Sequence, residues 1–240
     1  MTSCTKTIWI VVSKSQSGEN VPVRTQRMAA FFLFNYNLFT MMKTLISLLL
    51  VLLLSTSFKQ NTDCIKVDII LIADMSGSIK GHENYVHDAL FHFVNKFDLS
   101  EDGVRIGLIT FNDDAKVLYQ LGSDKEQLLK AVSTIISTVP DGTTNMMSSL
   151  VSAMNEFLKR GANQNRVVII ISDGSPFNID ATKQTANDLK NTFNSTIFGV
   201  LVQSTDENGQ FMREISSLGC YVQTDYSLLT SALKKLDMCI

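Results

Sequence analysis

Residues 67–78 read VDIILIADMSGS, a continuous apolar run that ends in a short polar loop. A short run rich in β-branched residues is typical of a central strand that is covered on both faces. Runs of the same kind occur at residues 104–109, 166–171 and 196–202. We therefore predict a sheet whose inner strands include these four segments.

Segments with a helical repeat of apolar residues lie between and after these runs, at residues 82–97, 124–136, 146–159, 180–193 and 227–236. Strands that alternate with helices predict βα crossovers. We therefore expect a single α/β domain with a doubly wound, mainly parallel sheet and helices on both faces. Residues 111–115 predict a tight turn into one short antiparallel edge strand at residues 116–119.

The composition is that of an ordinary globular protein with a substantial core. The chain has 240 residues, of which 45% are hydrophobic and 18% are charged, and its formal net charge is −2. So small a net charge gives no general attraction to nucleic acid or to anionic lipid. We therefore expect no nucleic-acid partner.

A leucine-rich segment precedes the predicted domain, at residues 41–60. Lys43 is followed by the apolar residues 44–54 and by Ser55-Thr56-Ser57, a pattern typical of a secretory signal peptide. The apolar core is shorter than the roughly 20 residues that span a bilayer, which favours cleavage over retention as a signal anchor. Residues 1–40, which lack periodicity, are interpreted as an upstream extension. The domain is then residues 61–240, secreted or displayed at the cell surface, with a membrane partner only if the signal remains as an anchor.

Three further features bear on an exported chain. Cys64 and Cys239 lie at the two ends of the predicted domain, and such a pair suggests a disulfide. Cys220 precedes a late strand and is interpreted as a small buried apolar residue. Residues 194–196, Asn-Ser-Thr, match an acceptor for N-linked glycan, which is relevant only in a eukaryotic secretory pathway.

Polar residues follow two of the predicted strands. Asp74, Ser76 and Ser78 alternate in the loop after the first run, and Asp173 follows the run at 166–171. Ligand sites of doubly wound sheets lie outside the carboxyl ends of the strands, so these side chains should meet there. The loop at residues 141–145 can add a threonine hydroxyl from the side. An all-oxygen set with few carboxylates favours Mg²⁺ or Mn²⁺ over Ca²⁺.

This ordered set resembles the metal-ion-dependent adhesion site of von Willebrand factor type A domains. The matching residues are Asp74-Met75-Ser76-Gly77-Ser78, then Thr144, then Asp173. Residues 105–111 and 171–174 are also similar to the corresponding segments of family members. The likeness runs from about residue 65 to residue 238. It implies that Ser76 and Ser78 bind the metal directly and that Thr144 does so when a partner is bound. Asp74 and Asp173 would act largely through water. Thr143 is the alternative to Thr144.

The resemblance implies metal-dependent recognition of a protein. A partner's Asp or Glu would replace a metal-bound water, so no small-molecule substrate is expected. Partner contacts would come from the rim of the site: Met75, Asp141, Gly142, Thr143, Asn145, Met146, Gly174 and Ser175. Met146 and Met147 would make this rim apolar. Family members couple ligation to movement of the last helix, which a Cys64–Cys239 bridge would restrain.

Two other function classes are weighed against a binding module. The metal could be structural in an assembly subunit, or the chain could be a magnesium-dependent hydrolase of the haloacid dehalogenase type. Such a hydrolase needs a second Asp two residues after the first, where this chain has Ser76. The sequence also has no G-x-S-x-G elbow, P-loop or G-x-G-x-x-G phrase. We therefore expect no enzymatic activity.

Overall fold

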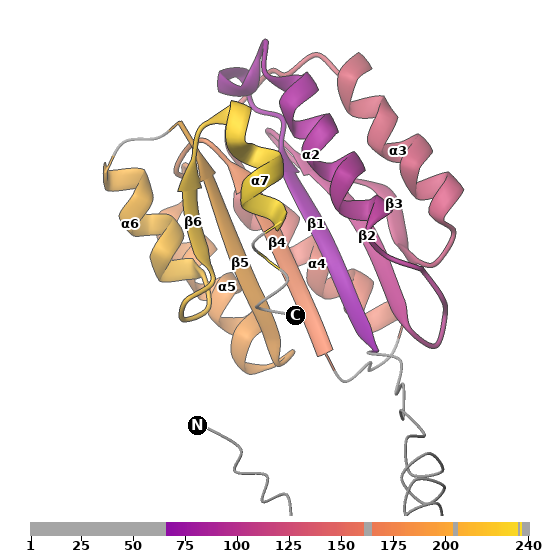
Figure 1. Cartoon of the computed structure of the whole chain (residues 1–240). Coiled ribbons are helices and arrows are strands. Elements are labelled where there is room, and N and C mark those ends of the chain that lie inside the picture. The colour runs from indigo at the N-terminus through magenta and orange to yellow at the C-terminus, as the bar shows by residue number, and fades with distance from the viewer. Residues whose placement is uncertain (1–65, 161–164, 204–205, 235, 237–240) are drawn as a thin grey trace, which may run out of the picture. The chain divides into compact units, whose positions relative to one another are not determined.

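The computed structural model describes residues 66–160, 165–203, 206–234 and 236. Its strands are β1 (Val67–Asp74), β2 (Val104–Phe111), β3 (Ala115–Gly122), β4 (Asn165–Ser172), β5 (Ser195–Val202) and β6 (Tyr221–Thr224). They form one sheet in the order β3-β2-β1-β4-β5-β6 (Figure 1). All neighbours pair in parallel except β2 and β3, which are antiparallel. The predicted mainly parallel sheet with one antiparallel edge strand is confirmed.

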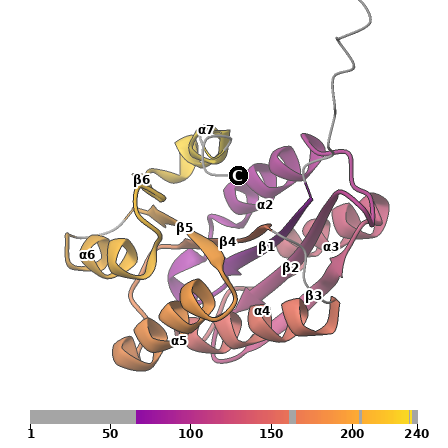
Figure 2. The ribbon, with the colours of Figure 1, turned by 90° about the horizontal axis from the view of Figure 1, so that it is seen from below.

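Helices cover both faces of this sheet (Figure 2). Their bounds are α2 (Glu83–Asn95), α3 (Lys125–Ser137), α4 (Met146–Arg160), α5 (Ile179–Asn191), α6 (Asp206–Ile215) and α7 (Leu229–Lys234), with 3₁₀ turns η1 (Gly77–Ile79) and η2 (Tyr226–Leu228). Helices α2, α3 and α7 pack on one face, and α4, α5 and α6 pack on the other. The described residues thus form a single three-layer α/β domain.

Strand β1 lies between two cores. Successive side chains of a strand point to opposite faces, so Ile69 and Leu71 pack with α2 while Ile70 and Ile72 pack with α4 and α5. All four side chains are fully buried. Burial of such a side chain stabilises the fold by about 1.5–3 kcal/mol, which explains why the run has no polar alternation.

Three elements differ from the sequence-based expectation. Strand β3 extends to Gly122 rather than ending at Tyr119, and its last residues are buried under α4. Helix α6 was not predicted, because its buried apolar residues are confined to Phe211, Met212 and Ile215. The expected last helix is shorter than residues 227–236: it is α7, preceded by the turn η2.

The expectations for the ends of the chain lie outside the described residues. These include the extension at 1–40, the signal at 41–60, and both Cys64 and Cys239. The expectation for Cys220 is confirmed, because its side chain is buried in the core shared with α2 and α7. Within the described ranges, the helices are too short or too polar to cross a membrane.

The direction of the strands places the functional loops together. Strands β1 and β4 are neighbours in parallel register, with Ala73 beside Ile171. Their carboxyl ends therefore lie at the same edge of the sheet, where Asp74 ends β1 and Asp173 follows β4. We call this the metal edge, after the predicted site.

Candidate metal centre

Asp74 is the buried carboxylate of the predicted site. Its Oδ1 accepts a hydrogen bond from the Ser76 backbone N–H at 2.8 Å, and its Oδ2 accepts one from the Ser172 hydroxyl at 2.5 Å. Burial raises the pKa of Asp74 to about 6 against the lowering effect of these hydrogen bonds, and the neighbouring Asp173 carboxylate adds to the rise. A cation beside Asp74 would stabilise its ionised form.

Ser76, Ser78 and Asp173 form a connected row of oxygen atoms. The Ser76 and Ser78 hydroxyl oxygens lie 3.1 Å apart, and the Ser78 hydroxyl donates to Asp173 Oδ1 at 2.8 Å. Ser76 has an extended backbone and immediately precedes the 3₁₀ turn η1, which carries Ser78. The structure therefore brings Asp74, Ser76, Ser78 and Asp173 together, although Asp173 is 95 residues from Ser78 in the chain.

The loop between α3 and α4 is held against this row by its backbone. The Asp141 N–H donates to the Met75 carbonyl at 3.2 Å, and the Gly77 N–H donates to the Gly142 carbonyl at 3.3 Å. Gly142 has a φ of +79°, and a Cβ added to it would meet the Asp113 carboxylate at 2.7 Å. A residue with a side chain would therefore be both strained and obstructed at this position.

The two adjacent threonines of this loop have different surroundings. Asp113 Oδ1 accepts hydrogen bonds from the Thr143 N–H at 2.7 Å and from the Thr143 hydroxyl at 2.8 Å. Thr144 is half-buried, and its hydroxyl has no hydrogen-bond partner within the described part of the chain. The Thr143 hydroxyl is thus already engaged, which favours Thr144 as the threonine available to a metal.

Two of the residues predicted for the rim are buried. The side chains of Met75 and Met146 are 3% and 0% exposed, because each packs into one of the two cores. Neither can present apolar surface to a partner. The remaining predicted rim residues are exposed or half-buried: Asp141, Gly142, Thr143, Asn145, Gly174 and Ser175. Exposed apolar side chains are found instead at Val139, 72% exposed in the loop between α3 and α4, and at Phe177, 67% exposed in the loop after β4.

Two residues of the site were missed by sequence reasoning. Ser172 donates to Asp74, and Tyr226 donates to Asp173 Oδ2 at 3.4 Å while its ring stacks on His82 at 4.0 Å. Burial raises the pKa of Tyr226, and Asp173 raises it further, so the phenol stays a neutral donor. Ser172 directly precedes Asp173 and could have been noticed. Tyr226 lies 53 residues away and has no local signal.

The donor set fits a hard divalent cation. It consists of carboxylate and hydroxyl oxygens, the ligands that suit Mg²⁺ and Mn²⁺. The described residues contain no cluster of three or more His, Cys, Asp or Glu side chains, so hydroxyls would have to complete a metal shell. No basic side chain within the described ranges forms an ion pair with Asp74 or Asp173. The negative charge of the cluster is therefore open to compensation by a metal.

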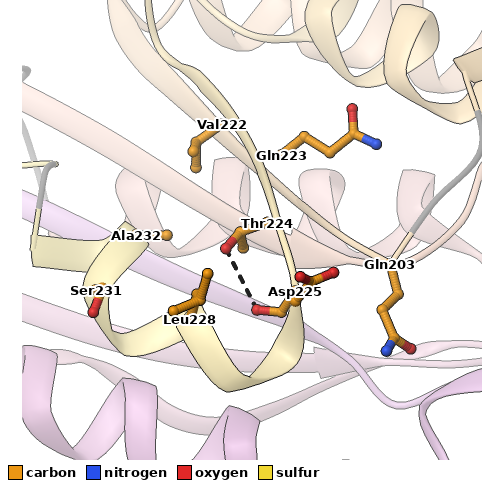
Figure 3. A pocket seen from close by; sticks show the side chains of 8 residues that line it. All are labelled: Gln203, Val222, Gln223, Thr224, Asp225, Leu228, Ser231 and Ala232. Carbon is orange, nitrogen blue, oxygen red and sulfur yellow. Dashed lines mark hydrogen bonds between the residues drawn. The ribbon is translucent and has the colours of Figure 1, made fainter.

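A surface hollow of about 740 Å³ lies beside β6 and α7 (Figure 3). Its lining is Gln203, Val222, Gln223, Thr224, Asp225, Leu228, Ser231 and Ala232. None of the predicted metal-site residues contributes to it. The hollow and the metal centre are therefore separate features of the domain.

Comparison with known proteins identifies the family that the sequence resembles. The family model for the von Willebrand factor type A domain matches residues 68–235. The thrombospondin-related anonymous protein of Plasmodium berghei is 31% identical over 146 residues, which are 56% of this chain and 24% of that protein. The chain thus matches about a quarter of the length of this curated relative.

Solved structures with this fold include metal-bound ones. The manganese-loaded TRAP protein of Plasmodium vivax has a TM-score of 0.57 and 26% identity, covering 71% of this chain and 72% of that one. Proximal thread matrix protein 1 from the mussel byssus, with a zinc-occupied MIDAS motif, has a TM-score of 0.62 and 20% identity over 72% of this chain and 47% of that one. Fold, site and family model agree, and the chain belongs to the von Willebrand factor type A domain family.

Proposed function

We propose that this domain is an exported module that binds a protein through Mg²⁺ or Mn²⁺ at the metal edge. The hydroxyls of Ser76 and Ser78 bind the ion directly, Asp74 and Asp173 act largely through water, and Thr144 joins when a partner is bound. The observation that carries the proposal is the row of oxygens from Ser76 through Ser78 to Asp173, beside a buried Asp74. The manganese-loaded relative supports a divalent cation.

The partner presents an Asp or Glu side chain to the ion. A cation held mainly by neutral hydroxyls keeps much of its charge and part of its water shell. A carboxylate from outside can then replace a water molecule and complete the shell. The exposed rim residues Asp141 and Thr143 and the half-buried Asn145 lie on the loop that is held against the metal residues, where they can contact the partner around that carboxylate.

We infer a binding function rather than an enzymatic one. Within the described residues, the hydroxyls of Ser76, Ser78 and Ser172 are hydrogen-bonded to carboxylates or to each other, and no histidine or lysine is hydrogen-bonded to them. No imidazole or amine base is therefore placed to activate one of them as a nucleophile. The leucine-rich segment at residues 41–60 supports export, and with it action outside the cell or at its surface.

Calorimetric titration tests the metal site directly. Mg²⁺ and Mn²⁺ are titrated into EDTA-stripped protein and into its Asp173→Ala and Ser76→Ala variants. We expect one saturable site, with affinity reduced at least tenfold in both variants. The matched control is Ser133→Ala, since Ser133 is an exposed serine of α3 whose hydroxyl bonds to the carbonyl of Leu129 in its own helix. Unchanged affinity in both site variants would contradict the assignment.

A second experiment separates recognition at the metal from a purely structural metal. Partners are captured from extracellular material on immobilised domain in Mg²⁺, in EDTA, and with Ser76→Ala. Recognition at the metal requires capture that is lost in EDTA and in the variant while the variant still unfolds cooperatively. Equal capture under all three conditions would place the partner elsewhere and leave an assembly role.

A further inference from the structure

The turn between α5 and β5 displays one asparagine in an unusual backbone conformation. Asn194 has a φ of +51°, in the left-handed region, and its side chain is exposed. It begins the phrase Asn194-Ser195-Thr196, the only Asn-X-Ser/Thr phrase in the whole sequence. Asparagine tolerates the left-handed conformation better than most residues, which explains why it suits the turn but leaves its amide without a structural task.

The turn itself is anchored on the side facing the protein. The Thr192 N–H donates to the Asp188 carbonyl at 2.8 Å, and Arg166 Nη1 donates to the Phe193 carbonyl at 3.2 Å. The Arg166 guanidinium also lies 5.6 Å from the centre of the Phe193 ring. Asn194 comes directly after these two anchored residues, and its side chain makes no hydrogen bond to any residue that the structure describes. It is therefore held outward and accessible.

The turn lies at the edge of the sheet opposite the metal edge. Ser195 begins β5 and pairs with Arg166 near the start of β4, whereas Asp173 follows the end of β4. A strand of eight residues is about 25 Å long, so a group attached to Asn194 would be about that far from the metal site. A group attached there would begin at the end of the strands away from the metal edge.

An exposed apolar residue lies in a second turn, which is hydrogen-bonded to β5. Leu218 is fully exposed in the turn between α6 and β6. Ser217 fastens that turn to β5, because its N–H donates to the Ile197 carbonyl at 2.8 Å and its hydroxyl accepts from the Ile197 N–H at 3.0 Å. Leu218 directly follows Ser217 in the chain, and Ser217 pairs with the residue three positions after Asn194.

We propose that Asn194 is an N-glycosylation site that carries a glycan at the edge opposite the metal. In this reaction the Asn194 amide nitrogen loses a proton and bonds to the anomeric carbon of a lipid-linked oligosaccharide, and the lipid pyrophosphate departs. Thr196 supplies the hydroxyl that the acceptor phrase requires. The proposal rests on the export that is part of the proposed function, and not on metal binding.

The test uses the full chain, secreted by a eukaryotic host. Treatment with peptide N-glycosidase should remove the mass of one glycan per chain and convert Asn194 to Asp in the peptide map. Asn194→Asp, which keeps a residue that tolerates the left-handed turn, should abolish the glycan, and so should Thr196→Ala. Asn191→Gln is the matched control, because Asn191 is exposed in the same connection but is followed by Thr192-Phe193 and is no acceptor.

The possible outcomes are distinct. One glycan that both site variants lose and the control retains supports the proposal. An unmodified Asn194 in the secreted chain overturns it, as does an unmodified chain retained inside the host cell. A glycan that persists in Thr196→Ala overturns the assignment to this phrase. Metal titration of the same preparations reports separately on the metal site, so failure of one proposal is distinguishable from failure of the other.

Discussion

The Asp113 carboxylate accepts two hydrogen bonds from one residue, the backbone N–H and the hydroxyl of Thr143, at 2.7 and 2.8 Å. These hydrogen bonds hold the pKa of Asp113 below its ordinary value. The Asn145 side chain adds a third link by donating to the Asp113 carbonyl at 2.9 Å. Asp113 therefore fixes the loop that presents Thr144 to the metal, although it is not itself one of the predicted ligands.

Replacing Asp113 with alanine should weaken metal binding without unfolding the protein. The loop around Thr144 would lose both anchors to Thr143, so the hydroxyl would no longer be held beside the ion. We expect about a tenfold loss of Mn²⁺ affinity, the lower end for residues that orient metal ligands. Titration calorimetry measures it. Asp114→Ala is the control, because within the described residues the Asp114 carboxylate accepts only from the N–H of Ala115 in its own turn. Equal losses in the two variants would refute a specific role for Asp113.

Asp74 should make the metal-free protein less stable as the pH rises. Its folded pKa is about 6, above the ordinary value of 3.8, so between these values the folded state binds more protons than the unfolded state. The free energy of unfolding therefore falls as the pH rises through this window, by about 3 kcal/mol from this group. Saturating Mg²⁺ should reduce the effect, because the ion favours the charged carboxylate.

Urea denaturation in EDTA at pH 4, 5, 6 and 7 measures this dependence. Asp74→Asn removes the titrating group and keeps its size, so subtracting its curve from that of the wild type isolates Asp74 from the other carboxylates. A difference that does not change with pH would show that Asp74 has an ordinary pKa in the folded protein.

Removing one partner of the ion pair between Asp68 and Arg105 should destabilise the fold. Arg105 Nε and Nη2 donate to the two Asp68 oxygens at 2.7 and 2.8 Å, and Asp68 is fully buried. Arg105→Met leaves a buried carboxylate without its cation, and we expect a loss of about 3–5 kcal/mol in the free energy of unfolding. The double variant Asp68→Val, Arg105→Met should recover much of it. A double variant no more stable than Arg105→Met would mean that lost packing is the main cost.

Glu156 should be needed as a hydrogen-bond acceptor rather than as a charge. Its Oε2 accepts from the Leu121 N–H of the edge strand β3 at 3.0 Å, and the residue is 1% exposed. Glu156→Ala leaves that N–H buried and unpaired, at a cost of about 1–3 kcal/mol. Glu156→Gln keeps an acceptor and should cost clearly less. Thermal unfolding of the two variants makes the comparison, and equal losses would assign the effect to charge instead.

The sheet could be predicted because its inner strands are buried on both faces. A continuous apolar run such as residues 67–73 is typical of a strand that is covered on both faces. The polar loop that follows such a strand lies at its carboxyl end, where ligand sites of these sheets are found. The same logic identified Asp74 and Asp173 as neighbours. Helix α6 was not predicted because it packs on the outer strands β5 and β6 with only a few apolar side chains.

The direction of single side chains could not be predicted from the sequence. Met75 and Met146 lie in the right loops for a rim, but their side chains turn into the two cores. Asp113 was interpreted as a turn residue, and its hydrogen bonds to Thr143 depend on how two loops approach each other. Tyr226 contacts Asp173 only because η2 lies over the end of β4. Such contacts arise from tertiary packing, which no local pattern records.

Strand β1 carries Asp74 at one end and begins with Val67 at the other. A pulling force applied between a partner held at the metal and the polypeptide that enters at Val67 would act along β1. Its parallel pairing with β2 and β4 extends over nearly its whole length, so the hydrogen bonds of both ladders would be loaded in shear rather than opened one after another. The Asp68–Arg105 pair fastens the entering end to β2. Tension along this axis would therefore be shared by the two ladders of β1 and by the Asp68–Arg105 pair.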